Sequence, residues 1–312
     1  MLGIIFLKNE SSYLNKVFKL NSINIMNINN CTKVINLCFN NIEKKQQQIK
    51  FVEKIINKLK KNNIDKVLIQ KDIYIISKEL INKFRESDIQ IITGNNIYEK
   101  NLNNIITYIL DNNSNLQIEQ VNLGILINKI TYKRLEYIKQ MASKVKCMTI
   151  ITEDKLKFEN TCTNIFENEG LSIKLSDNFR SGLKGSTIIV NFDIENKNIL
   201  DNIPNNCIYI NFGDCAEKMK KSFKGIIVND IKVKIDKEEN NLIQYLDENK
   251  FRNLAIAEAI TREDNNYLIT HLVGIKGNIP ISDIQNFDVI KRNKQNRGKK
   301  NKKWKKYNNI IM

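Results

Sequence analysis

The stretch VNLGILINKITYKRLEYIKQMASKVKCMTIITEDKLKFENTCTNIFENEGLSIKL, residues 121–175, decides the fold because short apolar runs alternate with amphipathic stretches along it. The runs at 123–127, 147–151 and 171–175 are rich in β-branched residues and predict strands. Between the first two runs, apolar side chains recur at helical spacing: Leu135, Ile138, Met141, Ala142 and Val145. Strands that alternate with helices predict a parallel sheet covered by helices.

The ends of the two helices in this stretch carry residues typical of helix caps. Thr131 and Asp154 stand just before them, and their side-chain oxygens predict N-caps. Gly170 follows the second helix, where a glycine can take the left-handed conformation that ends a helix.

The same alternation continues after residue 175. Apolar runs at 187–192, 207–212 and 225–228 bring the predicted strands of this half to six. Six short strands joined by crossovers predict a doubly wound sheet, in which ligand sites lie beyond the carboxyl ends of the strands.

The first part of the chain shows a similar pattern. Strand-like runs cover 3–7, 34–39, 66–69 and 89–92, and helical patterns cover 42–61, 77–85 and 98–110. The predicted fold class is therefore α/β, with two Rossmann-like parallel-sheet halves, the second a degenerate doubly wound sheet, and a disordered basic C-terminal tail. The polar break at 112–115 is interpreted as a domain boundary, and the pattern changes again after residue 235, where a helix at 238–260 and a strand at 267–273 are predicted. The predicted regions are therefore 1–118, 119–235, 236–290 and the basic tail 291–312.

Charge is concentrated at the C-terminal end. The formal net charge is +16, yet residues 291–312 hold ten basic residues and no acidic one, so the other 290 residues carry only +6. Aromatic residues interleave with these lysines, a pattern suited to RNA or another polyanion because cations meet phosphates while a ring stacks on a base. A solubilising tail is the alternative. The residues expected to make the contact are Lys299, Lys300, Lys302, Lys303, Trp304, Lys305 and Lys306.

Composition and length narrow the class of protein. The 312 residues, 42% of them apolar, suffice for two ordinary domains, so disorder throughout is excluded. No apolar run approaches the roughly 20 residues that a membrane-spanning helix needs. The six cysteines form no Cys-x-x-Cys pair, which argues against a structural zinc site and for a reducing, cytoplasmic setting. We therefore expect no metal and no resident cofactor.

The order of elements from 121 to 230 resembles the NAD(P)-binding Rossmann domain of the shikimate dehydrogenase and glutamyl-tRNA reductase type. The resemblance implies a glycine-rich turn after the first strand, where this chain has Asn128-Lys129-Ile130-Thr131. The side chains of Lys129 and Ile130 are expected to crowd the place of the diphosphate. The resemblance also implies an acidic ribose ligand, for which Glu153 or Asp154 is placed. The whole chain is similar to uncharacterised cytosolic proteins of low-GC bacteria.

Polar residues follow several predicted strands and define a candidate pocket. Asn128, Glu153, Asp193 and Asp214 each come where a strand ends, so topology predicts that they converge. Cys215 joins this set because nearby lysines and a helix N-terminus favour its thiolate, although Asp214 as a cap and Cys215 as a packing residue explain the same pattern.

The other cysteines and the single histidine carry no catalytic pattern. His271 lies in the strand-like run 267–273 and is expected to be partly buried. The cysteines expected to pack in apolar surroundings are Cys31, Cys38, Cys147, Cys162 and Cys207. No catalytic residue is therefore predicted.

The first functional hypothesis is a non-catalytic Rossmann-like scaffold whose basic tail contacts RNA or another polyanion. The alternative is an NAD(P)- or nucleotide-dependent enzyme acting in the crevice of the 119–235 region. A third is a component of a larger assembly with a protein partner.

Overall fold

The computed structural model describes most of the chain. The described residues are 1–7, 22–38, 45–71, 78–194, 199–213, 222–235, 242, 246–260 and 267–288. The chain divides into two compact units: residues 1–97 with 233–268, and residues 98–232 with the segment from 269 onward. The limits of the four regions proposed from the sequence stay a prediction.

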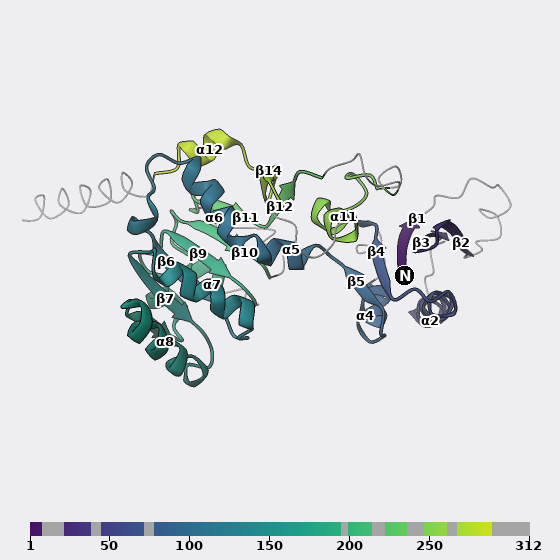
Figure 1. Cartoon of the computed structure of the whole chain (residues 1–312), viewed down its shortest axis with the longest axis horizontal. Coiled ribbons are helices and arrows are strands. Elements are labelled where there is room, and N and C mark those ends of the chain that lie inside the picture. Colours follow the sequence, from purple (N-terminus) through teal and green to yellow (C-terminus); the bar gives the residue numbers. More distant parts are fainter. Residues whose placement is uncertain are drawn as a thin grey trace, which may run out of the picture. The chain divides into compact units, whose positions relative to one another are not determined.

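The first unit contains a five-stranded sheet with the order β2-β3-β1-β4-β5 (Figure 1). Its strands are β1 (Leu2–Leu7), β2 (Ser22–Asn29), β3 (Thr32–Cys38), β4 (Lys66–Ile69) and β5 (Gln90–Ile92). Four of them are parallel, as the alternating pattern predicts, while β2 runs antiparallel to β3. The expected α/β fold is confirmed.

Strand β2 has no counterpart among the predicted strands. Its sequence SINIMNIN places Asn at every second or third position, and Asn is depleted in strands. The hairpin forms nonetheless, with a register shift between Asn27 and Asn29, and the Asn29 side-chain oxygen accepts the Cys31 N–H at 2.9 Å. Asparagine therefore stabilises the turn, while its low strand propensity explains why β2 is not predicted from the sequence.

Apolar side chains cover both faces of this sheet. On one face, α2 (Lys45–Lys61) and α4 (Lys78–Arg85) contribute Val52, Ile55 and Phe84, all fully buried. On the other face, α11 (Asn253–Ile260) contributes Ala255 and Ile256. A sheet covered on both faces explains why its parallel strands are continuous apolar runs.

The helix predicted at 238–260 is wrong in its extent. Of the described residues in that range, only Asn253–Ile260 are helical, and 248–250 form a turn. The Asp247 carboxylate accepts the Asn249 N–H at 2.9 Å, a local bond that competes with helix formation.

The second unit contains a six-stranded parallel sheet with the order β11-β10-β9-β6-β7-β8. Its strands are β6 (Asn122–Leu126), β7 (Cys147–Ile151), β8 (Ile173–Ser176), β9 (Ile188–Asn191), β10 (Ile208–Asn211) and β11 (Ile226–Val228). Numbered within the unit, the order is 6-5-4-1-2-3, the doubly wound arrangement of Rossmann folds. The predicted doubly wound sheet is confirmed.

Two helices precede these strands: α5 (Asn95–Lys100), which spans the boundary between the two units, and α6 (Leu102–Asp111). Those that follow along the chain are α7 (Tyr132–Ala142), α8 (Leu156–Glu169), α9 (Phe179–Gly182) and α10 (Ile199–Asn202). The single helix predicted at 98–110 is divided at Asn101, whose φ of −90° and ψ of 12° leave the helical region. The Asn101 side-chain oxygen accepts from Asn104 at 2.9 Å, which satisfies it locally.

Two of the three predicted helix caps are confirmed. The Thr131 hydroxyl accepts the Arg134 N–H at the start of α7, and Gly170 ends α8 with φ of 72°. Asp154 is not the N-cap of α8, because the helix begins at Leu156 with Lys155 in the cap position. The Asp154 carboxylate pairs with Lys157 at 2.8 Å, and this partner, together with the backbone of Leu156 and Lys157 in the first turn, lowers the pKa of Asp154.

A small sheet and a short helix complete the second unit. The strands are β12 (Asp230–Val233), β13 (Ile269–Gly274) and β14 (Gly277–Asn278), and the helix is α12 (Ile281–Gln285). Asn113, from the polar break at 112–115, is buried, and its amide donates to the carbonyls of Ile284 and Phe287 at 2.6 and 2.9 Å. Residues 118–120 form a 3-10 turn before β6.

Several single residues differ from expectation. His271 on β13 is exposed rather than partly buried. Cys207 is buried and Cys162 half-buried, whereas Cys31 in the hairpin turn and Cys147 at the start of β7 are exposed. The side chain of Cys38 lies outside the described residues.

Within the described part of the chain, no helix is both long and apolar enough to cross a membrane.

Gly170 provides a test of the helix end. Gly170→Ala is expected to destabilise the protein by about 1 kcal/mol, because an L side chain is strained at this positive φ even though no atom lies within 4 Å of the added Cβ. Gly170→Asn is expected to cost less, since Asn tolerates the left-handed region. Urea unfolding followed by far-UV circular dichroism measures both. An alanine variant as stable as the wild type would contradict this account of the helix end.

Candidate functional site

The candidate site lies where the strand order of the second sheet reverses. β6 and β9 are neighbours although they are the first and fourth strands of the unit, so the chain leaves their carboxyl ends in opposite directions. Ligands of doubly wound sheets bind at this switch point. The residues that follow β6 and β9 therefore decide what can enter.

The carboxylate of Asp193, just after β9, occupies the turn that follows β6. One of its oxygens accepts the N–H of Asn128 at 2.7 Å, and the other accepts the N–H of Lys129 at 2.9 Å. These amides belong to the turn whose counterpart in dinucleotide-binding folds approaches the diphosphate. In this chain the Asp193 carboxylate, rather than a ligand phosphate, accepts the hydrogen bonds of these amides.

Arg134 from the first turn of α7 holds this carboxylate from the helix side. Its guanidinium donates to Asp193 at 2.6 Å, to the carbonyl of Lys129 at 3.0 Å and to Glu99 of α5 at 2.8 Å. Burial lowers the pKa of Arg134, but the hydrogen bonds and charges of Glu99 and Asp193 outweigh it and raise the pKa above its usual value. One cation between two carboxylates leaves this group with a formal charge of −1.

Asn128 joins the turn after β6 to the turn after β7. Its side-chain oxygen accepts the Glu153 N–H at 3.0 Å and the Thr152 hydroxyl at 3.3 Å. Of the five residues of the candidate pocket, Asn128 and Asp193 are therefore in direct contact, and Glu153 joins them through its backbone while its side chain is exposed. Asp214 and Cys215 lie outside the described residues, so the pocket as a whole stays a prediction.

Aromatic rings fill the neighbouring edge of the sheet above β9 and β10. The centroid of Phe192 lies 5.9 Å from that of Tyr137 and 5.5 Å from that of Phe212, which in turn lies 4.4 Å from Tyr98. Arg134 stands over the Phe192 ring at 5.0 Å. The Tyr98 hydroxyl donates to the Val228 carbonyl at 3.1 Å, which fixes this row at its far end.

A buried polar network lies beneath these rings at the ends of β9 and β10. The Asn191 amide donates to Asn211, to the Tyr209 hydroxyl and to the Ile194 carbonyl, each at 3.0 Å. Burial raises the pKa of Tyr209, against the lowering effect of its hydrogen bond with Asn191. The network is satisfied by the protein itself and orders the segment that carries Phe192 and Asp193.

The expected crowding by Lys129 and Ile130 is not what fills the turn. Both side chains are exposed, Ile130 at 40%. The group bonded to the amides of the turn is the carboxylate of Asp193.

Arg134 and Glu99 are not among the pocket residues predicted from the sequence. Both lie on helices, where charged residues usually form the solvated face, so periodicity gives no sign of their pairing. The only available signal was the position of Arg134 three residues after a capping Thr131, at the end of the sheet where Asp193 was already expected.

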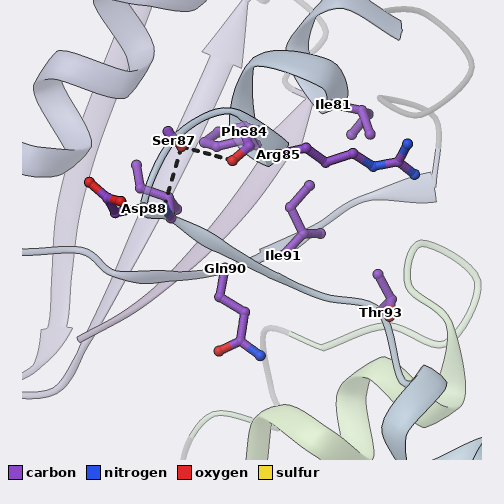
Figure 2. A pocket seen from close by; sticks show the side chains of 9 residues that line it. Ile81, Phe84, Arg85, Ser87, Asp88, Gln90, Ile91 and Thr93 are labelled. Carbon is purple, nitrogen blue, oxygen red and sulfur yellow. Dashed lines mark hydrogen bonds between the residues drawn. The ribbon is translucent and has the colours of Figure 1, made fainter. Parts of the chain in front are cut away.

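A second feature is an open groove in the first unit (Figure 2). It lies between α4 and the strand β5 and has a volume of about 450 Å³. Ile81, Phe84 and Ile91 supply apolar surface, and Arg85 and Asp88 stand at the rim. The Ser87 hydroxyl, visible in Figure 2, donates to the Phe84 carbonyl and accepts the Ile89 N–H, which orders the turn between helix and strand.

Among the described residues, no three His, Cys, Asp or Glu side chains gather in a way that could hold a metal ion.

Comparisons with known proteins give structural similarity alone. No family model and no curated protein matches the sequence. Among solved structures, a dipicolinate synthase component from Bacillus halodurans is 11% identical with a TM-score of 0.31, covering 48% of this chain, which spans about half (50%) of that protein's length. A putative aspartate carbamoyltransferase from Trypanosoma cruzi is 11% identical with a TM-score of 0.27, covering 71% of this chain and 72% of its own.

The ornithine carbamoyltransferase of Campylobacter jejuni gives similar values: 11% identity, a TM-score of 0.27, and 72% and 77% of the two chains covered. Similarities of this size carry no conclusion about activity.

Asp193→Ala is expected to lower the free energy of unfolding by about 1–3 kcal/mol, because two amides and the Arg134 guanidinium lose their acceptor. Asp193→Asn is expected to lose less, since it keeps one neutral oxygen. Glu153→Ala is the matched control on the adjacent turn and is expected to change stability by no more than about 0.5 kcal/mol. Urea unfolding compares the three, and equal stabilities for Asp193→Ala and Glu153→Ala would refute the role of Asp193.

Tyr137→Phe is expected to stabilise the protein by roughly 1 kcal/mol. The Tyr137 hydroxyl is buried and, among the described residues, has no hydrogen-bond partner. Burial raises the pKa of Tyr137, so the wild type loses stability as the pH rises above about 10, where the unfolded tyrosine ionises. Tyr137→Phe has no hydroxyl to ionise, so it does not lose this part of its stability at high pH. Thermal unfolding from pH 7 to 11, with the exposed Tyr132→Phe as control, tests both points; an identical pH profile for Tyr137→Phe and wild type contradicts them.

Proposed function

We propose that the chain is a non-catalytic, cytoplasmic binding protein built on a Rossmann-like scaffold, and that its basic C-terminal segment contacts RNA or another polyanion. The single observation that carries the first part is the Asp193 carboxylate on the Asn128 and Lys129 amides. A turn whose amides are already bonded to an internal carboxylate offers no donors to a diphosphate.

Charge at the switch point supports the same conclusion. Arg134, Asp193 and Glu99 together carry a charge of −1, so an entering phosphate meets repulsion.

The second part of the proposal rests on the sequence of the tail. Residues 291–312 lie outside the described residues, so their charge pattern alone supports the contact. Ten cations in 22 residues, with Trp304 among them and Tyr307 directly after the last, suit the regularly spaced phosphates and the stacking faces of single-stranded RNA.

Fluorescence anisotropy with a labelled single-stranded RNA tests the tail. We expect the full chain to bind and a variant ending at residue 290 to lose binding, because the truncation removes ten cations. If about five phosphates are contacted, a rise in salt from about 50 to 200 mM weakens binding by about 100-fold. Replacement of Lys299, Lys300, Lys302 and Lys303 by Gln is expected to reduce affinity and the salt slope together.

Equal retention of RNA by the full and the truncated chain would overturn the tail proposal. Glu153→Lys, which adds a cation at the edge of the second sheet, serves as a control for charge in general. It is expected to change affinity far less than the truncation.

The alternative is an NAD(P)- or nucleotide-dependent enzyme that acts in the crevice of the 119–235 region. The observation that favours it is the strand order of the second sheet, shared with dinucleotide-binding folds. It requires the Asp193 carboxylate to leave the turn when the nucleotide binds. The unfolding temperature, measured with and without NAD, NADP and nucleoside triphosphates, distinguishes the enzyme from the non-catalytic scaffold. A ligand at 100 times its dissociation constant stabilises the native state by about 2.7 kcal/mol. A shift with any of them would favour the enzyme.

A further inference from the structure

The strand β5 forms one edge of the sheet in the first unit. Among the described strands it pairs only with β4, so its other side is open in the order β2-β3-β1-β4-β5. An open strand edge presents backbone donors and acceptors to another extended chain.

The backbone of Ile91 faces this open side. The Gln90 N–H bonds to the Asp65 carbonyl in the direction of β4, and backbone groups of successive strand residues point to opposite sides. The N–H and carbonyl of Ile91 therefore point away from β4. Among the described residues, neither of these groups has a hydrogen-bond partner.

The groove beside this edge provides space for side chains. It is open to solvent and has a volume of about 450 Å³. Ile81 from α4 and the half-buried Ile91 from β5 line it on two sides. A strand added next to β5 would place every second side chain on this face of the sheet, against these residues.

The groove also carries a cation without an acidic partner. Figure 2 shows Arg85 extending from the end of α4, between Ile81 and Ile91 in this view. Its side chain is exposed and, in the described part of the chain, forms no ion pair. Asp88, the acid at the same rim, lies 3.5 Å from Lys60 instead.

We propose that β5 is a docking edge for an extended, acidic segment of a partner protein. The segment adds to the sheet as a sixth strand through the backbone of Ile91. It places an apolar side chain in the groove and a carboxylate on Arg85. The occupant is a peptide because the open backbone needs N–H and carbonyl partners, and it is acidic because the unpaired charge of the groove is positive.

A library of random octapeptides displayed on phage and selected on the full chain tests this proposal. We expect the selected peptides to alternate apolar residues and to share an Asp or Glu. A resynthesised peptide is expected to bind at least about tenfold more weakly to Arg85→Ala than to the wild type, because a charge-assisted bond is lost. Lys83→Ala, a cation on the same helix outside the groove, is the matched control and is expected to bind within about twofold of the wild type.

Two further measurements separate strand addition from simple charge attraction. Ile91→Pro removes the open N–H and leaves the bonds to β4 in place, so it is expected to abolish binding. In case this variant fails to fold, N-methylation of alternate amides in the peptide tests the same bonds from the partner's side. A charge exchange, Arg85→Glu with the peptide's acid replaced by Lys, is expected to restore binding.

Three outcomes would overturn the proposal. One is the absence of enriched peptides. Another is undiminished binding to Arg85→Glu or by the N-methylated peptide, which would place the contact elsewhere, for example on the basic tail. The third is self-association of the chain that Ile91→Pro abolishes, which would make a second copy the occupant.

Discussion

The hydrogen bonds between the Asp193 carboxylate and the amides of Asn128 and Lys129 are the interaction on which the site in the second unit depends. They join the turn after β6 to the segment after β9, the two places where the chain leaves the sheet in opposite directions. In doubly wound sheets these amides are the natural donors for an anionic ligand. Here a covalently attached carboxylate takes that position, and it does so without the entropic cost of binding a free ligand.

The surroundings of Asp193 reinforce this arrangement. Arg134 neutralises the carboxylate and is itself held by Glu99, while Phe192 lies under the guanidinium. The aromatic row and the Asn191 network fix the segment that carries Asp193, so the carboxylate has little freedom to move aside. The same fold that binds dinucleotides elsewhere is thus compatible with a purely structural sheet. Fold and activity are separable because activity depends on the few side chains at the switch point.

The sequence predicted the sheets well because both faces of a parallel sheet are buried, which forces continuous apolar runs such as 147–151. The predicted topology then placed Asn128 and Asp193 at the same edge of the sheet.

Three features of the structure were not predicted from the sequence, for physical reasons. β2 is rich in Asn, the partnership of Arg134 with Glu99 joins helices distant in sequence, and the residues before α11 form a turn closed by Asp247. Backbone pairing with β3 forms β2, an ion pair joins the two helices, and a side-chain hydrogen bond closes the turn. A single sequence does not reveal such partners.

Hydrogen exchange of the Asn128 and Lys129 amides, measured by nuclear magnetic resonance with and without millimolar NAD, tests the central claim most directly. If Asp193 occupies the turn, both amides are protected in the free protein, their protection falls in Asp193→Ala, and NAD changes neither their exchange rates nor their chemical shifts. Unprotected amides in the free protein that become protected when NAD is added would contradict the account.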